Sequence, residues 1–99
     1  HADCPVLFWP RLESALRDRA RSTSQACQWS RERLRLMDRT LVQGVRAVVA
    51  GHTPVAAPLV LGNVYHIDTE GWQSGYFSFL DLETLRAWPN DVVTDLAGA

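Results

Sequence analysis

A histidine directly after a buried apolar run is the first residue that could do chemistry. His52 lies in Gly51-His52-Thr53-Pro54, just beyond the β-branched run from Val45 to Ala50. Ligand crevices in open α/β sheets form at the carboxyl ends of strands, so His52 is placed where a metal ligand would be. Gly51 lets the backbone approach closely, and Thr53 could orient the ring or a neighbouring ligand. The alternative is an ordinary loop histidine.

The other two histidines carry less information. His1 opens the segment His1-Ala2-Asp3-Cys4-Pro5, which we interpret as a tight polar turn around Asp3 and Pro5. A terminal histidine by itself is a weak signal. His66 lies inside an expected strand and alternates with Ile67, so we interpret it as a structural or surface histidine.

The third candidate is the cluster Trp29-Ser30-Arg31-Glu32-Arg33. An arginine held between an aromatic and an acidic neighbour is suited to bidentate contact with a phosphate group. The alternative is a solvated helix face with Glu–Arg pairs, each worth well under ~1 kcal/mol. The cluster alone does not decide between them.

Helices are expected to position the first half of these residues. Proline suits a first helical turn, so a helix is predicted to begin near Pro10 and to run through Ala20. Ser22-Thr23-Ser24 is expected to break it and to cap a second helix over Gln25 to Met37. A short third helix is predicted from Asp38 to Gln43, ending at Gly44.

Strands are expected to position the rest. Val45 to Ala50 is typical of a buried strand, and Pro54 and Pro58 exclude a helix between them. A hairpin is predicted from Leu59-Val60-Leu61, a Gly62-Asn63 turn, and Val64 to Asp68. A loop from Gly71 to Gly75, a strand from Tyr76 to Leu82, a helical turn from Glu83 to Trp88 and a patternless tail from Pro89 complete the expected order.

Composition places the chain among ordinary globular domains. Of its 99 residues, 46% are hydrophobic and 21% charged, which argues against disorder. No apolar run approaches the roughly 20 residues that span a bilayer, so no membrane association is expected. A cytoplasmic protein with free thiols is the preferred interpretation of Cys4 and Cys27, although a disulfide stays open. A sequence that begins with His1 and has methionine only at Met37 suggests a piece of a longer product.

Charge is unevenly divided along the chain. Nine of the ten arginines lie in residues 1–46 with five acids, whereas residues 47–99 hold one arginine and six acids. Biased genomic base composition explains the absence of lysine most simply; contact of the arginine-rich half with anionic groups is the alternative. The net charge of −1 argues against nucleic acid as a partner.

Taken in order, the clusters resemble a known family. His1-Ala2-Asp3-Cys4-Pro5, Trp29-Ser30-Arg31-Glu32-Arg33, Gly51-His52-Thr53-Pro54, Asn63 and Ile67-Asp68-Thr69 are similar to the C-terminal region of the bacterial and phage-lambda-type phosphoprotein phosphatases, which are calcineurin-like metallophosphoesterases. The resemblance extends from residue 1 to about Leu82. It implies that residues 1–99 form the C-terminal portion of an αββα sandwich, an α/β fold with helices first and then a mixed sheet of three to four strands.

The resemblance also implies roles for individual residues. His1 and His52 match the two histidines that bind the second of two divalent metal ions, usually Mn²⁺. Arg31 matches an arginine that grips the substrate phosphate, while Asp68 and Thr53 would support the site. Two such metals activate a bridging hydroxide for in-line attack on phosphorus. The implied substrate is a phosphoprotein or phosphopeptide carrying phosphoserine or phosphothreonine, with phosphotyrosine left open.

The sequence departs from the family pattern at several points. Cys4 replaces an aromatic residue, and Glu70 replaces the glycine after Asp-Thr, where a positive φ would be strained. The motifs Gly-Asp-x-His-Gly, Gly-Asp-x-x-Asp-Arg-Gly and Gly-Asn-His-Glu, which supply the first metal's ligands and the general acid, do not occur. No catalytic residue is therefore assigned, and the 99 residues alone are expected to be inactive without the N-terminal half of the domain.

Two alternatives stay open. One is a dinucleotide polyphosphate hydrolase, which is similar in this region. The other is a non-catalytic remnant that binds a protein partner through unfinished sheet edges and the arginine-rich helices. A clean, stable monomer would count against a half-domain and favour an independent module.

Overall fold

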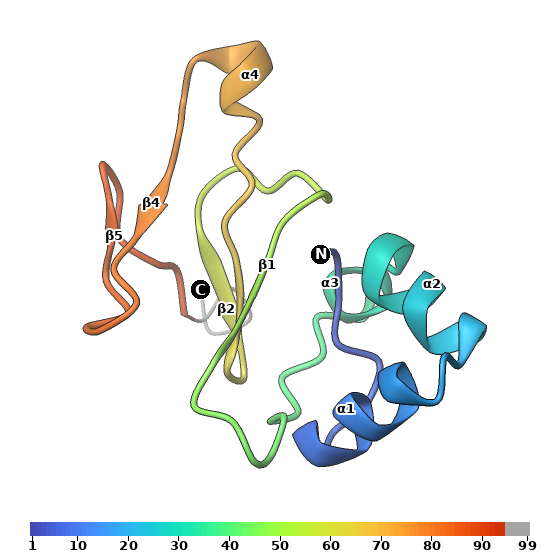
Figure 1. Cartoon of the computed structure of the whole chain (residues 1–99). Helices are drawn as coiled ribbons and strands as arrows, with labels where there is room; N and C mark the ends of the chain where they lie inside the picture. The colour runs from blue at the N-terminus through green and yellow to red at the C-terminus, as the bar shows by residue number, and fades with distance from the viewer. Residues whose placement is uncertain (95–99) are drawn as a thin grey trace.

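The computed structural model describes residues 1–94 and has three parts in chain order (Figure 1). Three helices come first: α1 (Trp9–Arg17), α2 (Arg21–Trp29) and α3 (Glu32–Leu36). A sheet of β1 (Val48–Ala50), β2 (Leu59–Leu61) and β3 (Val64–His66) follows. An arm with α4 (Gly71–Ser74), β4 (Phe79–Leu80) and β5 (Ala87–Trp88) completes the chain. The predicted α/β class, with helices before a small mixed sheet, is confirmed.

The first helix begins as predicted, but the helical boundaries after it were wrong. Pro10 lies in the first turn of α1, where its missing N–H has no helical partner to lose. Ser22-Thr23-Ser24 does not break a helix and instead lies inside α2, which packs against α1. The expected single helix from Gln25 to Met37 is interrupted at Ser30 and Arg31, before α3.

The segment from Asp38 to Gln43 is extended rather than helical, which corrects the third predicted helix. Arg33 Nη1 donates to the carbonyl oxygens of Asp38 and Thr40, at 2.8 Å each. Asn63 holds both backbone groups of Val42, accepting from its N–H at 2.8 Å and donating to its carbonyl at 2.9 Å. Because distant side chains satisfy these backbone groups, the segment does not need helical hydrogen bonds.

The sheet has the order β1-β3-β2. β3 pairs in parallel with β1, with Ala50 opposite His66, and antiparallel with β2. The predicted hairpin is confirmed, although its second strand ends at His66 and not at Asp68 as expected. Its turn needs Gly62 at φ +64°, since a Cβ there would lie 2.7 Å from the Arg39 carbonyl oxygen. The N-terminal segment runs between the helices and this sheet (Figure 1).

The arm differs from the prediction in all its elements. Gly71–Ser74 forms the short helix α4 in place of a loop. The strand expected over Tyr76 to Leu82 is reduced to Phe79–Leu80, and it pairs with Ala87–Trp88 where a helical turn was expected. The tail from Pro89 returns to the sheet through a bridge between Val93 and Leu59; residues 95–99 of that tail lie outside the described residues.

The core lies between the N-terminal segment, α1 and the sheet. Its buried cluster is Cys4, Leu12, Val42 and Val64. Cys4 and Cys27 are both free thiols, as predicted, and burial raises the pKa of each. Among residues 1–94, no helix has the length and apolar character needed to cross a bilayer.

Candidate functional site

The structure brings His1 and His52 together at the end of β1. Their ring centroids lie 4.8 Å apart with the planes tilted by 41°. A backbone hydrogen bond holds the two segments together, because the Gly51 N–H donates to the His1 carbonyl oxygen at 2.7 Å. Two residues separated by fifty positions in sequence therefore form one side-chain cluster, which we call the histidine pair.

Each ring of the histidine pair is held by a neighbouring element. His1 Nδ1 lies 3.0 Å from the Gln28 carbonyl oxygen and donates to it when this nitrogen carries the proton; in the neutral ring this leaves the lone pair on Nε2. The indole of Trp29 packs edge-on against His52, with centroids 5.1 Å apart. A hydrogen bond from the far ring nitrogen to a carbonyl is how metal-ligating histidines are commonly oriented.

The backbone at His52 is in the left-handed region, with φ +67°. Histidine enters this region more readily than bulky or β-branched residues, yet the conformation is uncommon and marks a position to test for function. The following Thr53 N–H donates to the Gly51 carbonyl oxygen at 2.7 Å, which closes a tight turn around His52. The sequence therefore turns sharply where β1 ends, and His52 is the residue at the bend.

Arg31 and Arg33, two residues apart, have opposite environments. Arg31 is exposed and lines a groove of about 320 Å³ together with Thr53, Pro54 and Val55. Within residues 1–94, no hydrogen bond or ion pair occupies its side chain. Arg33 is 5% exposed and serves the fold. Only Arg31 is therefore available for an anion beside the Gly-His-Thr-Pro turn.

Asp3 is the residue that joins these pieces, and the sequence reasoning gave it no role. Its carboxylate accepts hydrogen bonds from the Cys4 N–H at 2.7 Å, the Ser30 hydroxyl at 3.2 Å and the Arg33 N–H at 3.3 Å. It also lies 3.8 Å from Arg33 Nε, an ion pair too long to be a hydrogen bond. The polar turn around Asp3 and Pro5 was the available signal.

This network sets the position of Arg31. Asp3 takes the place of a capping residue for α3 from thirty positions away, and the Ser30 hydroxyl accepts from the Glu32 N–H at 3.2 Å. Arg31 is the residue between the two anchored positions Ser30 and Glu32. The interruption between α2 and α3, which was not predicted from the sequence, therefore leaves Arg31 exposed between two anchored positions.

Asp68 and Thr53, which the resemblance implies would support the site, differ in their bonding. Asp68 Oδ1 accepts from the Glu70 N–H at 2.9 Å, and its carbonyl accepts from the Val55 N–H at 2.8 Å, which ties the turn after His52 to the end of β3. Thr53 Oγ1 is buried with no hydrogen-bond partner among residues 1–94. Its orienting role stays a prediction.

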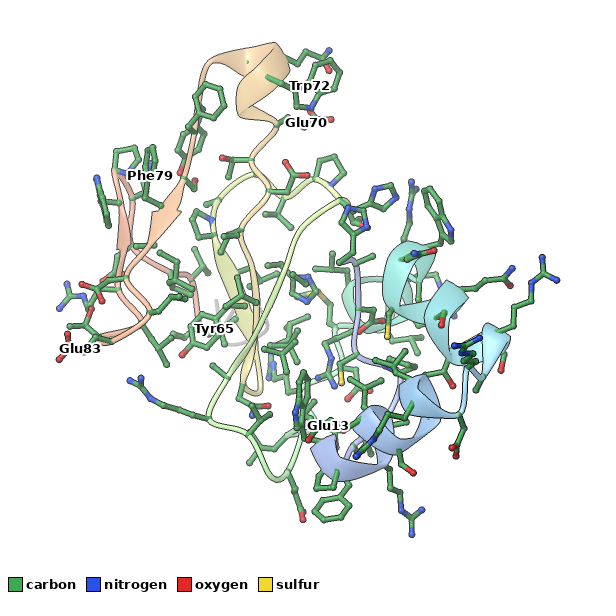
Figure 2. The ribbon with its side chains drawn as sticks, in the orientation of Figure 1. Glu13, Tyr65, Glu70, Trp72, Phe79 and Glu83 are labelled. Carbon is green, nitrogen blue, oxygen red and sulfur yellow. The ribbon has the colours of Figure 1, made fainter. Side chains whose placement is uncertain are left out.

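Glu70 has the positive φ that would be strained for a residue other than glycine. Its φ is +56°, in the left-handed region where the family pattern has glycine. The preceding Thr69 is buried and donates to the Tyr76 carbonyl oxygen at 2.6 Å. Glu70 therefore lies at the point where the chain leaves the sheet for the arm, and Figure 2 shows it beside Trp72, above the sheet.

His66 is buried in the sheet, which settles its interpretation as structural. It is 1% exposed, and neither ring nitrogen has a hydrogen-bond partner among residues 1–94. Burial lowers its pKa; the nearby Asp3 carboxylate opposes this shift and Arg33 reinforces it. His66 is therefore a core histidine whose neutral form is favoured by burial.

The chemistry of the site is consistent with part of a metal centre. Two neighbouring imidazoles, with ring centroids 4.8 Å apart, are the type of side chain that ligates a transition metal such as Mn²⁺ or Zn²⁺. Among residues 1–94, however, no three His, Cys, Asp or Glu side chains are arranged to hold a metal ion together. Further ligands would have to come from water or from protein segments other than these.

Comparison with known proteins adds no assignment. The chain matches no protein-family model and no curated protein, and its structure matches no solved structure. The function proposed below therefore rests on the geometry of the site and on the motif resemblance in the sequence.

Proposed function

We propose that this chain is the C-terminal portion of a metal-dependent phosphoprotein phosphatase, in which His1 and His52 bind one metal ion and Arg31 binds the substrate phosphate. The observation that carries the proposal is the pairing of His1 with His52, 4.8 Å between centroids. The exposed, unengaged Arg31 across the groove from Thr53 supports the phosphate role.

In this proposal the chain's own residues bind and orient. The Gln28 carbonyl fixes the His1 ring, Trp29 packs against His52, and Asp3 holds the turn that presents Arg31. When bound, a pair of divalent metal ions supplies the activated hydroxide for attack on phosphorus. The remaining ligands and the general acid belong to the motifs that these 99 residues lack, so the chain alone is inactive.

Metal binding by the histidine pair is testable on the chain itself. We expect substoichiometric Mn²⁺ to broaden the imidazole NMR signals of His1 and His52 first, with the signal of buried His66 least affected. The variant His52→Gln should reduce Mn²⁺ affinity by about tenfold or more, because one of two protein ligands is lost. Equal broadening of all three histidines, or an unchanged affinity in the variant, would contradict the proposed ligands.

Activity is tested by restoring the rest of the domain. The chain would be expressed with whatever coding sequence precedes His1 and assayed with Mn²⁺ on phosphoserine, phosphothreonine and phosphotyrosine peptides and on p-nitrophenyl phosphate. Arg31→Met should raise KM or lower kcat/KM by about 100-fold, while the matched variant Arg17→Met, at an exposed arginine outside the groove, should retain activity. An upstream sequence without any of the three missing motifs would overturn the phosphatase proposal. A cytoplasmic location is proposed with it, supported by the two free thiols.

A second candidate function is a protein-binding module without catalysis. The supporting observation is the run of exposed aromatic side chains on the arm, Trp72, Phe77, Phe79 and Trp88, each more than half exposed. Single exposed apolar residues are common, but four on one small arm are typical of an interaction surface. A stable, monodisperse chain that binds neither Mn²⁺ nor phosphate would favour this function.

A further inference from the structure

The groove beside Arg31 also contains aliphatic side chains that have no part in the proposed binding of phosphate. It has a volume of about 320 Å³, and its lining side chains are Arg31, Leu34, Arg35, Thr53, Pro54 and Val55. Leu34 and Val55 are half-buried and Pro54 is exposed, so the aliphatic surface is accessible beside the charged group. Arg31 and Thr53 belong both to this groove and to the proposed phosphate site.

The two arginines of the groove differ in availability. Arg35 is held by Glu32 on the same helix, through hydrogen bonds of 2.6 Å and 3.3 Å. Arg31 has no such partner within residues 1–94. A groove with one free guanidinium beside an aliphatic surface is suited to a ligand that carries one anionic group and an apolar group a short distance from it.

We propose that this groove binds the side chain two positions from the phosphorylated residue of an extended peptide, and that it selects an aliphatic side chain there. The inference rests on the proposed function, because Arg31 is taken to hold the phosphate. Successive side chains of an extended chain point to opposite faces, so the side chain two positions away, about 6.6 Å along the chain, shares the face of the phosphate and can contact Leu34 and Val55.

The lining favours a peptide over a nucleotide. Protein sites for nucleobases stack the base on aromatic or guanidinium planes and read its edge with amide or carboxylate groups. None of the six lining side chains is aromatic, and none carries an amide or a carboxylate to read the edge of a base; of the two guanidinium groups, Arg35 is held by Glu32 and Arg31 is assigned to the phosphate. An aliphatic side chain, in contrast, needs only apolar area to be removed from water.

The test is a set of NMR titrations on the ¹⁵N- and methyl-labelled chain. The probes are inorganic phosphate, a phosphoserine peptide with leucine two positions before or two positions after the phosphoserine, the same peptide with glycine at both of those positions, its unphosphorylated form, and diadenosine tetraphosphate. We expect the leucine peptide to bind about tenfold more tightly than the glycine peptide, through shifts at Arg31, Leu34 and Val55.

Two variants examine the groove by different routes. Val55→Thr keeps the shape of the side chain and adds a hydroxyl, and Leu34→Ala removes apolar area. Both should abolish the preference for leucine while leaving phosphate affinity unchanged. Leu36→Ala is the matched control, because Leu36 is an exposed leucine on the same helix α3, 59% exposed and outside the groove. Circular dichroism checks that each variant is folded.

The outcomes separate the two proposals. Equal binding of leucine and glycine peptides, with Arg31 shifts in both, would overturn the groove assignment and leave the phosphate site standing. Tighter binding of diadenosine tetraphosphate than of either peptide would overturn it in favour of a nucleotide substrate. Absence of any Arg31 shift with phosphate and phosphopeptide would overturn the proposed function, and this inference with it.

Discussion

Residues 1–69 and the arm that follows them are built in different ways. In the first region, buried side chains bond backbone groups 20 to 30 positions away, as Asp3 does with Arg33, Asn63 with Val42 and Arg33 with Leu61. In the arm, hydrogen bonds are mostly local, such as those that the Asp81 carboxylate accepts from the N–H groups of Glu83 and Thr84. Figure 2 shows Trp72 and Phe79 on the arm, away from α1, α2 and α3.

The difference explains where the candidate site is found. Positions fixed by several long-range bonds hold a side chain in one place, and His1, Arg31 and His52 all lie in the first region. The arm instead presents a stacked aromatic pair, Phe79 and Trp88, that is largely exposed. Rigid positioning suits chemistry, whereas exposed aromatic area suits association. Substitutions in residues 1–69 and in the arm should therefore have unequal effects on the stability of the chain.

Arg33→Met is expected to have the largest effect. It would leave the Asp3 carboxylate, which is about 6% exposed, without its countercharge and would free three carbonyl groups. Removing one partner of a buried ion pair costs about 3–5 kcal/mol of the free energy of unfolding. Urea unfolding measures the loss. The matched control is Arg35→Met on the same helix, whose exposed partner is Glu32; an equal loss in both variants would contradict the buried network.

Asn63→Ala should be the next most damaging change. The amide of Asn63 bonds both backbone groups of Val42 and the Val45 carbonyl oxygen, and Val42 is 1% exposed. Leaving these groups unpaired costs about 2 kcal/mol in the free energy of unfolding. Asn90→Ala is the comparison in the arm, where the amide bonds only the Tyr76 hydroxyl. Similar losses from both substitutions would erase the distinction between the two regions.

The buried His66 predicts a pH dependence of the first region. Its pKa is lowered in the folded state by burial, so the folded chain binds fewer protons than the unfolded chain below about pH 6.5. Stability is therefore complete above this pH and falls as the pH is lowered toward the folded-state pKa. Unfolding measured between about pH 7 and pH 5 should show this slope. His66→Leu should flatten it, and a variant slope equal to that of the original chain would rule out His66 as its source.

Glu70→Gly should stabilise the junction with the arm. A left-handed conformation costs a non-glycine residue about 1–2 kcal/mol, and glycine's greater unfolded-state entropy returns part of this, so we expect a gain of about 0.5–1 kcal/mol. Thermal unfolding measures it. Gln73→Gly, in the adjacent helix α4, should do the reverse by about 1 kcal/mol. Destabilisation by both would mean that the Glu70 side chain contributes more than its backbone costs.

Trp72→Ser should change stability least. Its side chain is 77% exposed, so its removal is expected to alter the free energy of unfolding by less than about 0.5 kcal/mol. If the arm is an association surface, the same substitution should lower self-association, measured by light scattering at increasing concentration. A large loss of stability would show that the arm is held more tightly than its contacts suggest.

Several elements could be predicted from local patterns because their causes are local. Pro10 begins α1, and the Gly62-Asn63 turn with flanking apolar residues gives the hairpin of β2 and β3. Pro54 and Pro58 exclude a helix in the segment after His52, where the structure has none. His1, Arg31 and His52 could be selected as candidates because of their residue types and their order.

Other elements could not be predicted, because distant residues decide them. The break before α3 depends on Asp3, which bonds Ser30 and the Arg33 N–H across about thirty positions. The extended segment from Asp38 to Gln43 depends on Arg33 and Asn63, and the end of α2 is not visible in its own residues. A local sequence pattern does not indicate which distant side chain will supply a hydrogen bond.

Residue types and local patterns are enough to predict the class of the fold, the hairpin, and the residues that are candidates for binding phosphate and metal. The packing of distant segments is what places His1 against His52, leaves Arg31 exposed while Arg33 is buried, and brings Asp3 to both Ser30 and Arg33. This is because side-chain type and local backbone preference depend only on a residue and its neighbours in the sequence. Burial and charge pairing exist only once distant segments have been packed together.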